Sequence, residues 1–468
     1  MRMTKQVSTI PAWGIRYSTG LAHIHSQLPF RNSCGWKEKL SWGRYLQTSI
    51  SPTVMWDPEQ SGLGVPLAGV YTSITDQLWR LRCEKLDNES TDSKALPQTD
   101  LVTKTPQTTS IRYPFASSAA MREEYRSPWG KVRLGKILED LDSLAGTIAF
   151  MHCDDDNPTT MPHLIVTASV DEIHQYAPLH LDTDLILAGV VTWVGKSSLS
   201  IRMEATQEEA GGCLSATPSL SADFTFVARS PATHAAALVN PLHPITPEER
   251  ALFKAGDLKA LSRKKARTAA AAGSADTPQK HDFVTKLLGE SRQLLDLPSL
   301  GDSRAILMSQ TRQENTFLCQ PQQRNMAGRV FGGFIMRRAF ELAFASSYVF
   351  AGSRPIFLGV DEITFQRPVN VGDLLRLKAC VLHASAMDAQ TANCIQKSKH
   401  VTEDMVGLLH VEVNAYVTQP ENATSVLSNT FNFRFGVERA HADQKLKKVL
   451  PETEVEARRI WDVVHMGI

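Results

Sequence analysis

Several features that would indicate common protein classes are missing from this chain of 468 residues. No apolar run approaches the roughly 20 residues that a membrane-crossing helix requires. The seven cysteines are scattered without a Cys-x-x-Cys pair, and their odd number argues against a disulfide framework. No Gly-x-Ser-x-Gly elbow is present, which disfavours a serine hydrolase. The formal net charge is only +1, so nucleic acid is not an expected partner.

Acidic residues are absent from the first 37 positions, which contain five basic residues: Arg2, Lys5, Arg16, Arg31 and Lys37. Together with many Ser and Thr, this composition is typical of a mitochondrial transit peptide, which we expect over residues 1–45. It predicts a location in the mitochondrial matrix, and a disordered basic tail is the alternative. Residues 46–119 are polar and weakly patterned, so we expect a poorly ordered extension or a strap over the first domain.

A glycine pair precedes a long apolar segment in the second half of the chain. The segment begins at Asn325, continues to Gly332 and Gly333, and then becomes apolar over Phe334–Phe344. This pattern predicts a loop entering a buried helix. Without a Cβ, the glycines allow a ligand close to the backbone, and the first helix amides can stabilise negative charge on a carbonyl oxygen. A packing or turn role for the glycines is the alternative.

The same unit occurs earlier in the chain. Aligning Gly135 with Gly333 superposes further features in the same order: Gly130 with Gly328, Val170–Ile173 with Val360–Ile363, Asp184 with Asp373, and Phe224–Ala228 with Val413–Val417. The last match depends on equal spacing from the preceding one. Two units with one order of features indicate an internal duplication.

Alternating apolar residues predict strands at Leu185–Val194, Leu199–Met203 and Leu408–Val417. Each unit is therefore α+β, with one helix against an antiparallel sheet. A helix as apolar as Phe334–Phe344 should be wrapped by its sheet, which is the hotdog arrangement. The sequence thus predicts two tandem hotdog domains.

The predicted domains cover residues 120–235 and 301–440. Between them, residues 236–300 turn basic and then low in complexity, which predicts a partly disordered linker. Its basic cluster at Arg263–Arg267 is expected to be a solvated charge run, with contact to phosphates as the alternative. Residues 441–468 are expected to form a C-terminal tail.

These segments resemble the mitochondrial acyl-coenzyme A thioesterase 9 family of double-hotdog, type II thioesterases. The resemblance runs from about Arg122 to Gly436 and is carried by Arg133–Leu144, Trp193–Ser197, Val239–Leu242, Glu248–Phe253, Arg324–Arg337, Gly352–Pro355 and Val360–Gln366. It implies an enzyme that hydrolyses acyl-CoA to free fatty acid and coenzyme A, without a metal and with no cofactor beyond the coenzyme A of the substrate.

The resemblance also implies a composite site. In such enzymes one unit supplies an Asn on the loop before its helix, here Asn325, and the other an acid inside its helix, here Asp142. Ser127 and Phe340 stand in the reverse positions, so only one site has both parts. Glu341, one residue from the missing acid, is an alternative base.

The implied chemistry divides the work between the two units. The amides near Gly333, with Asn325, polarise the thioester carbonyl. Asp142 activates water as general base or attacks the carbonyl itself, and both possibilities stay open. Glu139 lies one turn earlier on the same helix face and is an alternative base or a supporting residue. Asp140 is expected at the surface.

Substrate contacts can be predicted only by position. Gly332 allows a close approach to the backbone, and the coenzyme A phosphates require basic residues, for which the candidates are Arg324, Arg329, Arg337 and Arg367. Each arginine is otherwise a surface charge. We expect Cys319 to be a buried thiol and His152–Asp156 to be a loop of solvated acids.

Two other functions stay open. A hotdog hydratase or dehydratase needs an acid and a His in one site, and neither helix region offers a His at helical spacing. A degenerate duplication could instead bind acyl-CoA without turnover. Because hotdog units pair through sheet edges, we expect a homo-oligomer, by family resemblance a trimer of double hotdogs.

Overall fold

A computed structural model describes residues 54–56, 74–75, 77–78, 96–98, 100–155, 157, 160–207, 215, 217–272, 277–325, 328–361, 363–386, 405–438 and 446–465. All of them lie within one compact unit, Ser41–Ile468. The predicted transit peptide, residues 1–45, lies outside the described residues, as does most of the predicted extension that follows it.

The first half of the chain forms a helix and an antiparallel sheet. The sheet order is β3-β6-β7-β8-β5, with helix α4 packed against β5, β6, β7 and β8. The bounds are β3 Thr109–Tyr113, α4 Leu134–Cys153, β5 Leu164–Gln175, β6 Leu185–Val194, β7 Ser198–Gln207 and β8 Leu220–Arg229. Nearly every residue of α4 is buried, because the sheet curves around a helix that is apolar on most of its surface.

The second half repeats this arrangement with the equivalent order β10-β13-β14-β15-β11 around helix α7. The bounds are β10 Gln313–Leu318, α7 Gly332–Ala351, β11 Pro355–Val360, β13 Leu374–Ala386, β14 Met405–Gln419 and β15 Thr424–Glu438. The internal duplication and the two hotdog domains are therefore confirmed.

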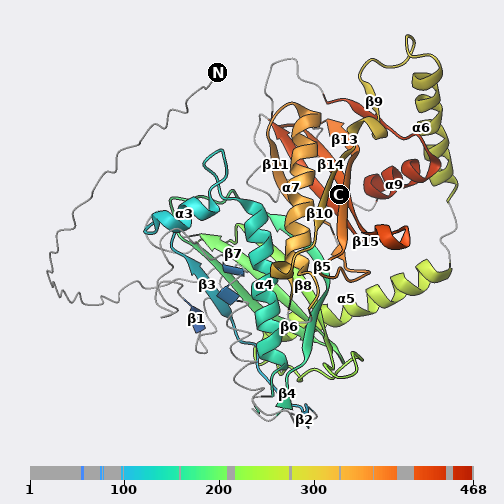
Figure 1. The fold of residues 1–468 in the computed structure, drawn as a ribbon. Helices are drawn as coiled ribbons and strands as arrows, with labels where there is room; N and C mark the ends of the chain where they lie inside the picture. The colour runs from blue at the N-terminus through green and yellow to red at the C-terminus, as the bar shows by residue number, and fades with distance from the viewer. Residues whose placement is uncertain are drawn as a thin grey trace, which may run out of the picture. The chain divides into compact units, whose positions relative to one another are not determined.

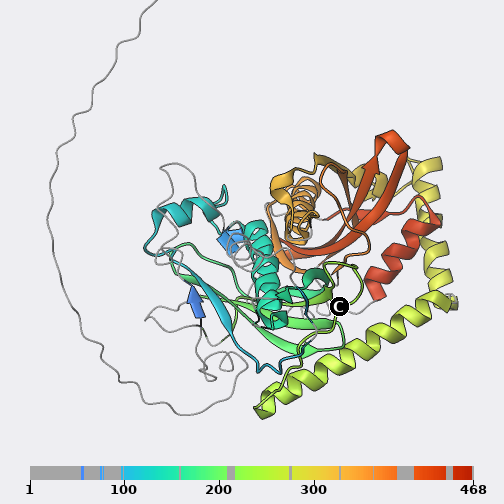
Figure 2. The ribbon, with the colours of Figure 1, turned by 60° about the horizontal axis from the view of Figure 1, so that its bottom comes forward.

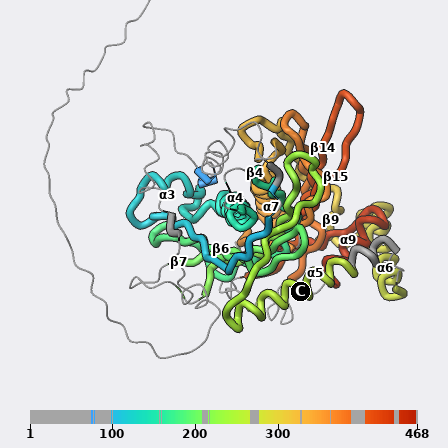
Figure 3. The backbone as a smooth tube through the Cα atoms, turned by 90° about the horizontal axis from the view of Figure 1, so that it is seen from below, coloured from blue at the N-terminus to red at the C-terminus, as the bar shows by residue number. Residues whose placement is uncertain are grey.

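The two units join through their sheets and their helices. β5 pairs antiparallel with β11, and the short β12 (Ile363–Thr364) also pairs with β5, so the sheets of the two units are continuous and twelve of the described strands form one sheet. Helices α4 and α7 pack against each other, as Figures 1 and 3 show. A Cβ on Gly333 would lie 2.9 Å from the carbonyl oxygen of Glu139, so this glycine permits the close approach of the two helices.

One predicted strand match is wrong. Phe224–Ala228 lies in β8, whose counterpart by sheet order is β15, whereas Val413–Val417 lies in β14, the counterpart of β7. The equal spacing was a coincidence. Only residues 195–197 separate β6 from β7, but residues 387–404, which lie outside the described residues, separate β13 from β14.

The segment expected to be a linker contains two helices, α5 (Pro247–Ala272) and α6 (Pro278–Asp296). Thr277 caps α6 through its side chain and Pro278 occupies the first turn, both strong helix-start features. Figure 2 shows α5 as a long helix beside the sheet of the first unit, against β6. The connection between the units is therefore largely helical.

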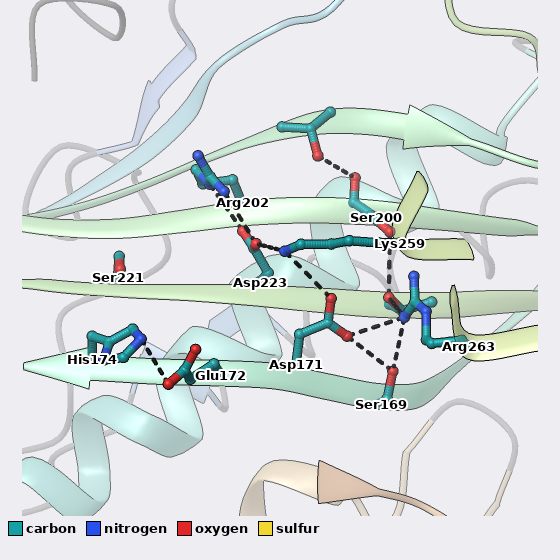
Figure 4. A network of polar contacts seen from close by, with 12 residues as sticks. Ser169, Asp171, Glu172, His174, Ser200, Arg202, Ser221, Asp223, Lys259 and Arg263 are labelled. Atoms are coloured by element: carbon teal, nitrogen blue, oxygen red, sulfur yellow. Dashed lines mark hydrogen bonds and ion pairs between the residues drawn. The ribbon is translucent and has the colours of Figure 1, made fainter. Parts of the chain in front are cut away.

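Polar side chains attach α5 to the outer face of the first sheet (Figure 4). Arg263 donates to Asp171 at 3.0 Å and to Thr225 at 2.9 Å, and Lys259 donates to Asp223 at 2.7 Å. Trp193 adds a hydrogen bond from Nε1 to Asp257 at 2.7 Å. Arg263 is thus part of a structural network, and its expected place in a solvated charge run is wrong.

The terminal segments also belong to the folded unit. β3 lies within residues 46–119, so this part of the predicted extension is a strand of the first sheet. In the predicted tail, β16 (Lys448–Leu450) pairs with β9 (Ala305–Leu307), and α9 (Glu454–His465) packs against α6 and β13. The remaining elements are β1 Val54–Trp56, β2 Leu96–Pro97, α3 Ala119–Tyr125, β4 Thr160–Met161, and 3₁₀ turns at Met308–Thr311, Pro321–Gln323 and Pro420–Asn422.

Candidate active site

A small cavity of about 50 Å³ lies where the two units meet. Its walls come from α4, the start of β5, β8 and the loop that leads into α7, and they include Asp142, His163, Thr167, Asn325 and Gly332. Asp142 belongs to the first unit, while Asn325 and Gly332 belong to the second. The structure therefore brings the two predicted halves of the composite site together. The volume is enough for ordered water.

Asp142 is a buried carboxylate whose two oxygens both accept hydrogen bonds. The backbone N–H of Gly333 donates to Oδ2 at 2.7 Å, and the Thr167 hydroxyl donates to Oδ1 at 3.0 Å. Only 1% of Asp142 is exposed. A buried charge needs such partners, and an amide in the first turn of α7 also brings the positive end of the helix dipole. The carboxylate is therefore fixed in position.

The Gly333 amide was expected to face a substrate carbonyl. In this structure it faces Asp142 instead, because α7 begins directly beside the middle of α4. The Gly333 amide therefore holds the Asp142 carboxylate in position. Gly332 lies equally close, since a Cβ there would be 3.2 Å from Oδ2 of Asp142.

Asn325 is held in a tight turn before α7. Its Oδ1 accepts a hydrogen bond from the backbone N–H of Arg329 at 3.1 Å, and its carbonyl oxygen accepts one from Gly328 at 3.0 Å. Gly328 has a φ of 74°, a left-handed conformation that favours glycine. The turn orients the carboxamide of Asn325 at the cavity wall.

The alternative bases Glu139 and Glu341 do not line this cavity. Arg337 bridges them, at 2.7 Å to Glu139 and 3.2 Å to Glu341. Arg133 and Arg338 also contact Glu341, each at 2.9 Å. Burial raises the pKa of Glu341, but the arginines more than offset it, and the net pKa is lowered. These acids therefore join α4 to α7.

The predicted phosphate-binding arginines differ in their surroundings. Arg337 is bound to Glu139 and Glu341 and is mostly buried, so the structure does not support a substrate contact for it. Arg324 and Arg329 flank Asn325, with Arg324 exposed, and Arg367 is exposed on the segment after β12. These three stay predictions.

The sequence analysis missed two polar residues of the cavity wall, Thr167 and His163. Both come from the segment that leads through β5, far from either helix motif. Burial lowers the pKa of His163, partly offset by a backbone contact at Leu238 and by Asp155. Its Nδ1 is buried and has no hydrogen-bond partner among the described residues. A single polar residue in or beside a strand gives no sequence signal that it lines an active site, so neither residue could be predicted.

Other predicted positions are resolved by their contacts. Cys319 is buried, so the prediction of a buried thiol is confirmed, and burial raises its pKa to about 11. The expectation of a solvated loop at His152–Asp156 is wrong for its first three residues, because His152 and Cys153 end α4 and Asp154 is buried. His152 contacts the carbonyl oxygen of Asn240 at 2.9 Å. Among the described residues there is no group of metal-ligating side chains, and no described helix is long and apolar enough to span a membrane.

The expectation that Asp140 lies at the surface is wrong. It is 1% exposed and accepts hydrogen bonds from the hydroxyls of Tyr113 at 3.1 Å and Thr75 at 2.7 Å, and from that of Tyr125. Because α4 has almost no exposed face, a side chain such as Asp140 that points away from Asp142 is still buried.

Comparisons with known proteins identify relatives over most of the chain. It is 45% identical over 403 residues to "Acyl-coenzyme A thioesterase 2, chloroplastic" of Humulus lupulus, covering 84% of this chain and 89% of that protein. "Acyl-coenzyme A thioesterase 4, mitochondrial" of the same plant is 43% identical, covering 84% and 73%. "Acyl-coenzyme A thioesterase 9, mitochondrial" of Homo sapiens is 33% identical, covering 75% of each. No family model matches the chain.

Solved structures of lower identity are also similar. An acyl-CoA hydrolase of Staphylococcus aureus, in complex with butyryl coenzyme A and coenzyme A, is 21% identical with a TM-score of 0.27, covering 35% of this chain and 87% of that one. An acyl-CoA hydrolase of Agrobacterium tumefaciens is 13% identical with a TM-score of 0.22, covering 74% and 99%.

Proposed function

Because this chain belongs to the acyl-coenzyme A thioesterases, we propose that the small cavity between α4 and α7 is its active site. The protein is a hydrolase that cleaves an acyl-CoA thioester with water, giving a carboxylic acid and coenzyme A. The observation that carries the proposal is the contact of Asp142 with Gly333 in a cavity that Asn325 also lines.

The proposed reaction uses water held beside Asp142. The carboxylate accepts a proton from this water as the water oxygen attacks the thioester carbonyl. Asn325, oriented by its turn, donates a hydrogen bond to the carbonyl oxygen, which carries negative charge in the tetrahedral intermediate. When the carbon–sulfur bond breaks, the thiolate of coenzyme A takes the proton back from Asp142.

We favour Asp142 as base over Asp142 as nucleophile. Thr167 and Gly333 each hold one of its oxygens, which fixes the carboxylate and makes either oxygen a weaker attacking group. Turnover in ¹⁸O-labelled water separates the two routes. Label found in the peptide containing Asp142 would require an anhydride intermediate and would contradict the general-base route.

Thiol release from acyl-CoA in the full-length chain tests the site. We expect Asp142→Asn to lower kcat by about 10²–10⁴, as for loss of a general base. Asn325→Ala should lower it by about 10²–10³, as for loss of an oxyanion donor. Glu139→Gln and Glu341→Gln are the matched controls and should retain turnover. An active Asp142→Asn variant, or an inactive Glu341→Gln variant that remains folded, would move the site elsewhere.

A hydratase activity is the second candidate, and His163 is the observation that favours it. The cavity contains an acid and a histidine, the pair that the hydratase alternative requires. Hydration of an enoyl-CoA lowers its absorbance without releasing thiol. Thiol release without formation of a 3-hydroxyacyl-CoA would leave only the hydrolase, and a 3-hydroxyacyl-CoA formed without thiol release would leave only the hydratase.

We propose that the enzyme acts in mitochondria, specifically in the matrix. The acid-free, basic composition of the first 37 residues supports this location, and the names of its relatives include both mitochondrial and chloroplastic enzymes. Fusing residues 1–45 to a fluorescent protein tests the proposal. Import into chloroplasts, or retention in the cytosol, would contradict it.

We also propose that the chains assemble into a trimer of double hotdogs. Strand β10 supports assembly, because it is the last strand of the sheet and five of its six residues are exposed. Unpaired edges of this kind favour pairing with another chain. Light scattering after size exclusion should give three times the chain mass of 51.7 kDa, and a monomer would contradict assembly.

A further inference from the structure

A second and larger cavity, of about 490 Å³, lies at the opposite end of the contact between α4 and α7. Its size falls within the roughly 300–1,000 Å³ that is usual for small-molecule sites. Its walls are the counterparts of those around the small cavity: the turn before α4 replaces the turn before α7, α7 replaces α4, and β11 replaces β5. The two cavities share no lining residue.

The turn before α4 has the same hydrogen bonds as the Asn325 turn. The Ser127 hydroxyl accepts from the backbone N–H of Lys131 at 3.1 Å, as Asn325 accepts from Arg329. Gly130 has a φ of 68°, matching the left-handed Gly328. The duplication therefore kept the framework of the second site, with Ser in place of Asn.

The second site lacks the acid of the first and is more apolar. Phe340 stands where the first unit has Asp142, and Phe344 stands where it has Gly146. The neighbouring acid Glu341 is engaged by three arginines, which keep its pKa low and its charge neutralised. Phe340 thus occupies the position of Asp142, and the nearby Glu341 is held in ion pairs, so this cavity lacks the counterpart of the first site's acid.

The lining of the cavity has an apolar wall and a cationic rim. Leu134, Ile356 and Phe357 add to the phenylalanines, and the ring of Trp129 lies 5.5 Å from that of Phe344. Lys131, Arg133 and Arg354 supply positive charge, against Glu341, which is already paired, and Glu438. Arg354 lies 5.8 Å above the Trp129 ring.

We propose that this cavity is a second, non-catalytic site that binds an aliphatic acyl chain carrying an anionic head group. The acyl chain lies against the aromatic wall, where its methylenes are removed from water. The head group lies at the rim near Arg354 and Lys131. The inference rests on the proposed function, because it takes the small cavity as the catalytic one. Free fatty acid and acyl-CoA share this chemistry.

Binding to full-length Asp142→Asn protein tests the proposal without turnover. Dodecanoate is one probe, and the S-dodecyl thioether of coenzyme A, which cannot be hydrolysed, is the other. We expect binding to change the fluorescence of Trp129, and the change to disappear in Trp129→Phe. Binding of both probes would show that a carboxylate suffices as head group, and binding of the thioether alone would assign coenzyme A.

Two variants and a control locate the site. Ile356→Glu places a charge in the apolar wall and should weaken binding by more than about tenfold. Arg354→Glu alters only an exposed rim residue and should weaken binding by about tenfold. It therefore tests the site even if Ile356→Glu does not fold. Val349→Glu, on an exposed part of α7 outside the cavity, should bind normally.

The proposal is overturned if neither probe gives a Trp129-dependent signal, or if binding is unaffected by both variants. Failure of the proposed catalytic site has a different signature. In that case Asp142→Asn would still release thiol from acyl-CoA, whatever the result at the second cavity.

Discussion

Two carboxylates on α4, Asp140 and Asp142, are equally buried but have different partners. Asp142 accepts from a backbone amide and a threonine at the interface of the two units. Asp140 accepts from tyrosine and threonine hydroxyls inside the first unit. Burial raises the pKa of Asp140 to about 6, although Tyr125 and Thr75 lower it in part. One helix thus carries a candidate catalytic acid and a structural one.

The raised pKa of Asp140 predicts how stability depends on pH. The folded chain binds this proton more tightly than the unfolded chain, so the contribution is complete below the ordinary value of 3.8 and is lost as pH rises through about 6. Asp140→Asn cannot ionise. Its free energy of unfolding, relative to wild type, should therefore rise by about 1–3 kcal/mol between pH 4 and pH 7. Urea unfolding at each pH measures this, and parallel curves would contradict it.

Thr167 offers a test of how Asp142 is held. Thr167→Val keeps the shape of the side chain and removes the donor to Oδ1. A hydrogen bond to a charged group contributes about 1.5–3 kcal/mol, so we expect kcat to fall about 10–100-fold with little change in KM. Thr192→Val is the control, because its hydroxyl donates to the backbone carbonyl of Ser200 at 3.3 Å, away from Asp142. Equal effects in both variants would indicate a general loss of structure.

The sequence could predict Asp142 and Asn325 but not Thr167 or His163. Asp142 and Asn325 lie in a repeated motif with fixed spacing to a glycine, and resemblance assigned both. Thr167 and His163 reach the cavity only because β5 lies against α4 in the folded chain. That proximity is a tertiary property, and no local pattern encodes it.

At the scale of elements, the contact of α4 with α7 depends on Gly333. A Cβ there would meet the Glu139 carbonyl at 2.9 Å and the Phe331 ring at 2.6 Å. Gly333→Ala should therefore push the helices apart, destabilise the fold by about 1–3 kcal/mol and lower thiol release, since the amide of this residue holds Asp142.

Gly289 in α6 is the matched control for this prediction. A Cβ there meets nothing within 4 Å, so Gly289→Ala should stabilise the fold by about 0.5–1 kcal/mol. Thermal unfolding and thiol release of both variants give the comparison. A Gly333→Ala variant with normal stability and rate would show that α4 and α7 can separate freely.

Helix α5 shows why sequence patterns missed an element. Lys259 and Arg263 attach it through polar contacts (Figure 4). Asp257 adds a hydrogen bond, and Phe253 is the apolar residue that packs against the core. Apolar periodicity, the main sign of a packed helix, is weak when the docking contacts are ion pairs and hydrogen bonds. The basic and Ala-rich composition was therefore interpreted as a linker.

At the scale of the whole molecule, the C-terminal helix α9 is attached to the second sheet by a buried charge. Arg459 pairs with Glu412, which is 5% exposed, whereas the adjacent Arg458 pairs with the exposed Glu454 on its own helix. Arg459→Ala should cost about 3–5 kcal/mol, because it removes the cation paired with the buried Glu412 carboxylate and leaves the hydrogen bond from Asn414 at 2.6 Å to replace it. Arg458→Ala should cost about 0–0.5 kcal/mol. Chemical unfolding compares them, and equal effects would contradict the role of Glu412.

The duplication was predictable because both units keep the glycine-to-helix motif. The correspondence of the later strands was not, because the segment between β13 and β14 is much longer than the turn between β6 and β7. Insertions in connections change spacing without changing sheet order, so spacing alone misaligns strands. The packing of α9 could not be predicted either, because its partner Glu412 lies in the distant strand β14.

The helical connection α5–α6 makes one polypeptide of two units, and this has a genetic consequence. In a homodimer of identical units, replacing the helix acid by phenylalanine would remove both sites at once. In a single chain, each half can vary alone. Phe340 in the second half is therefore compatible with an intact Asp142 in the first, and selection can act on the two halves separately.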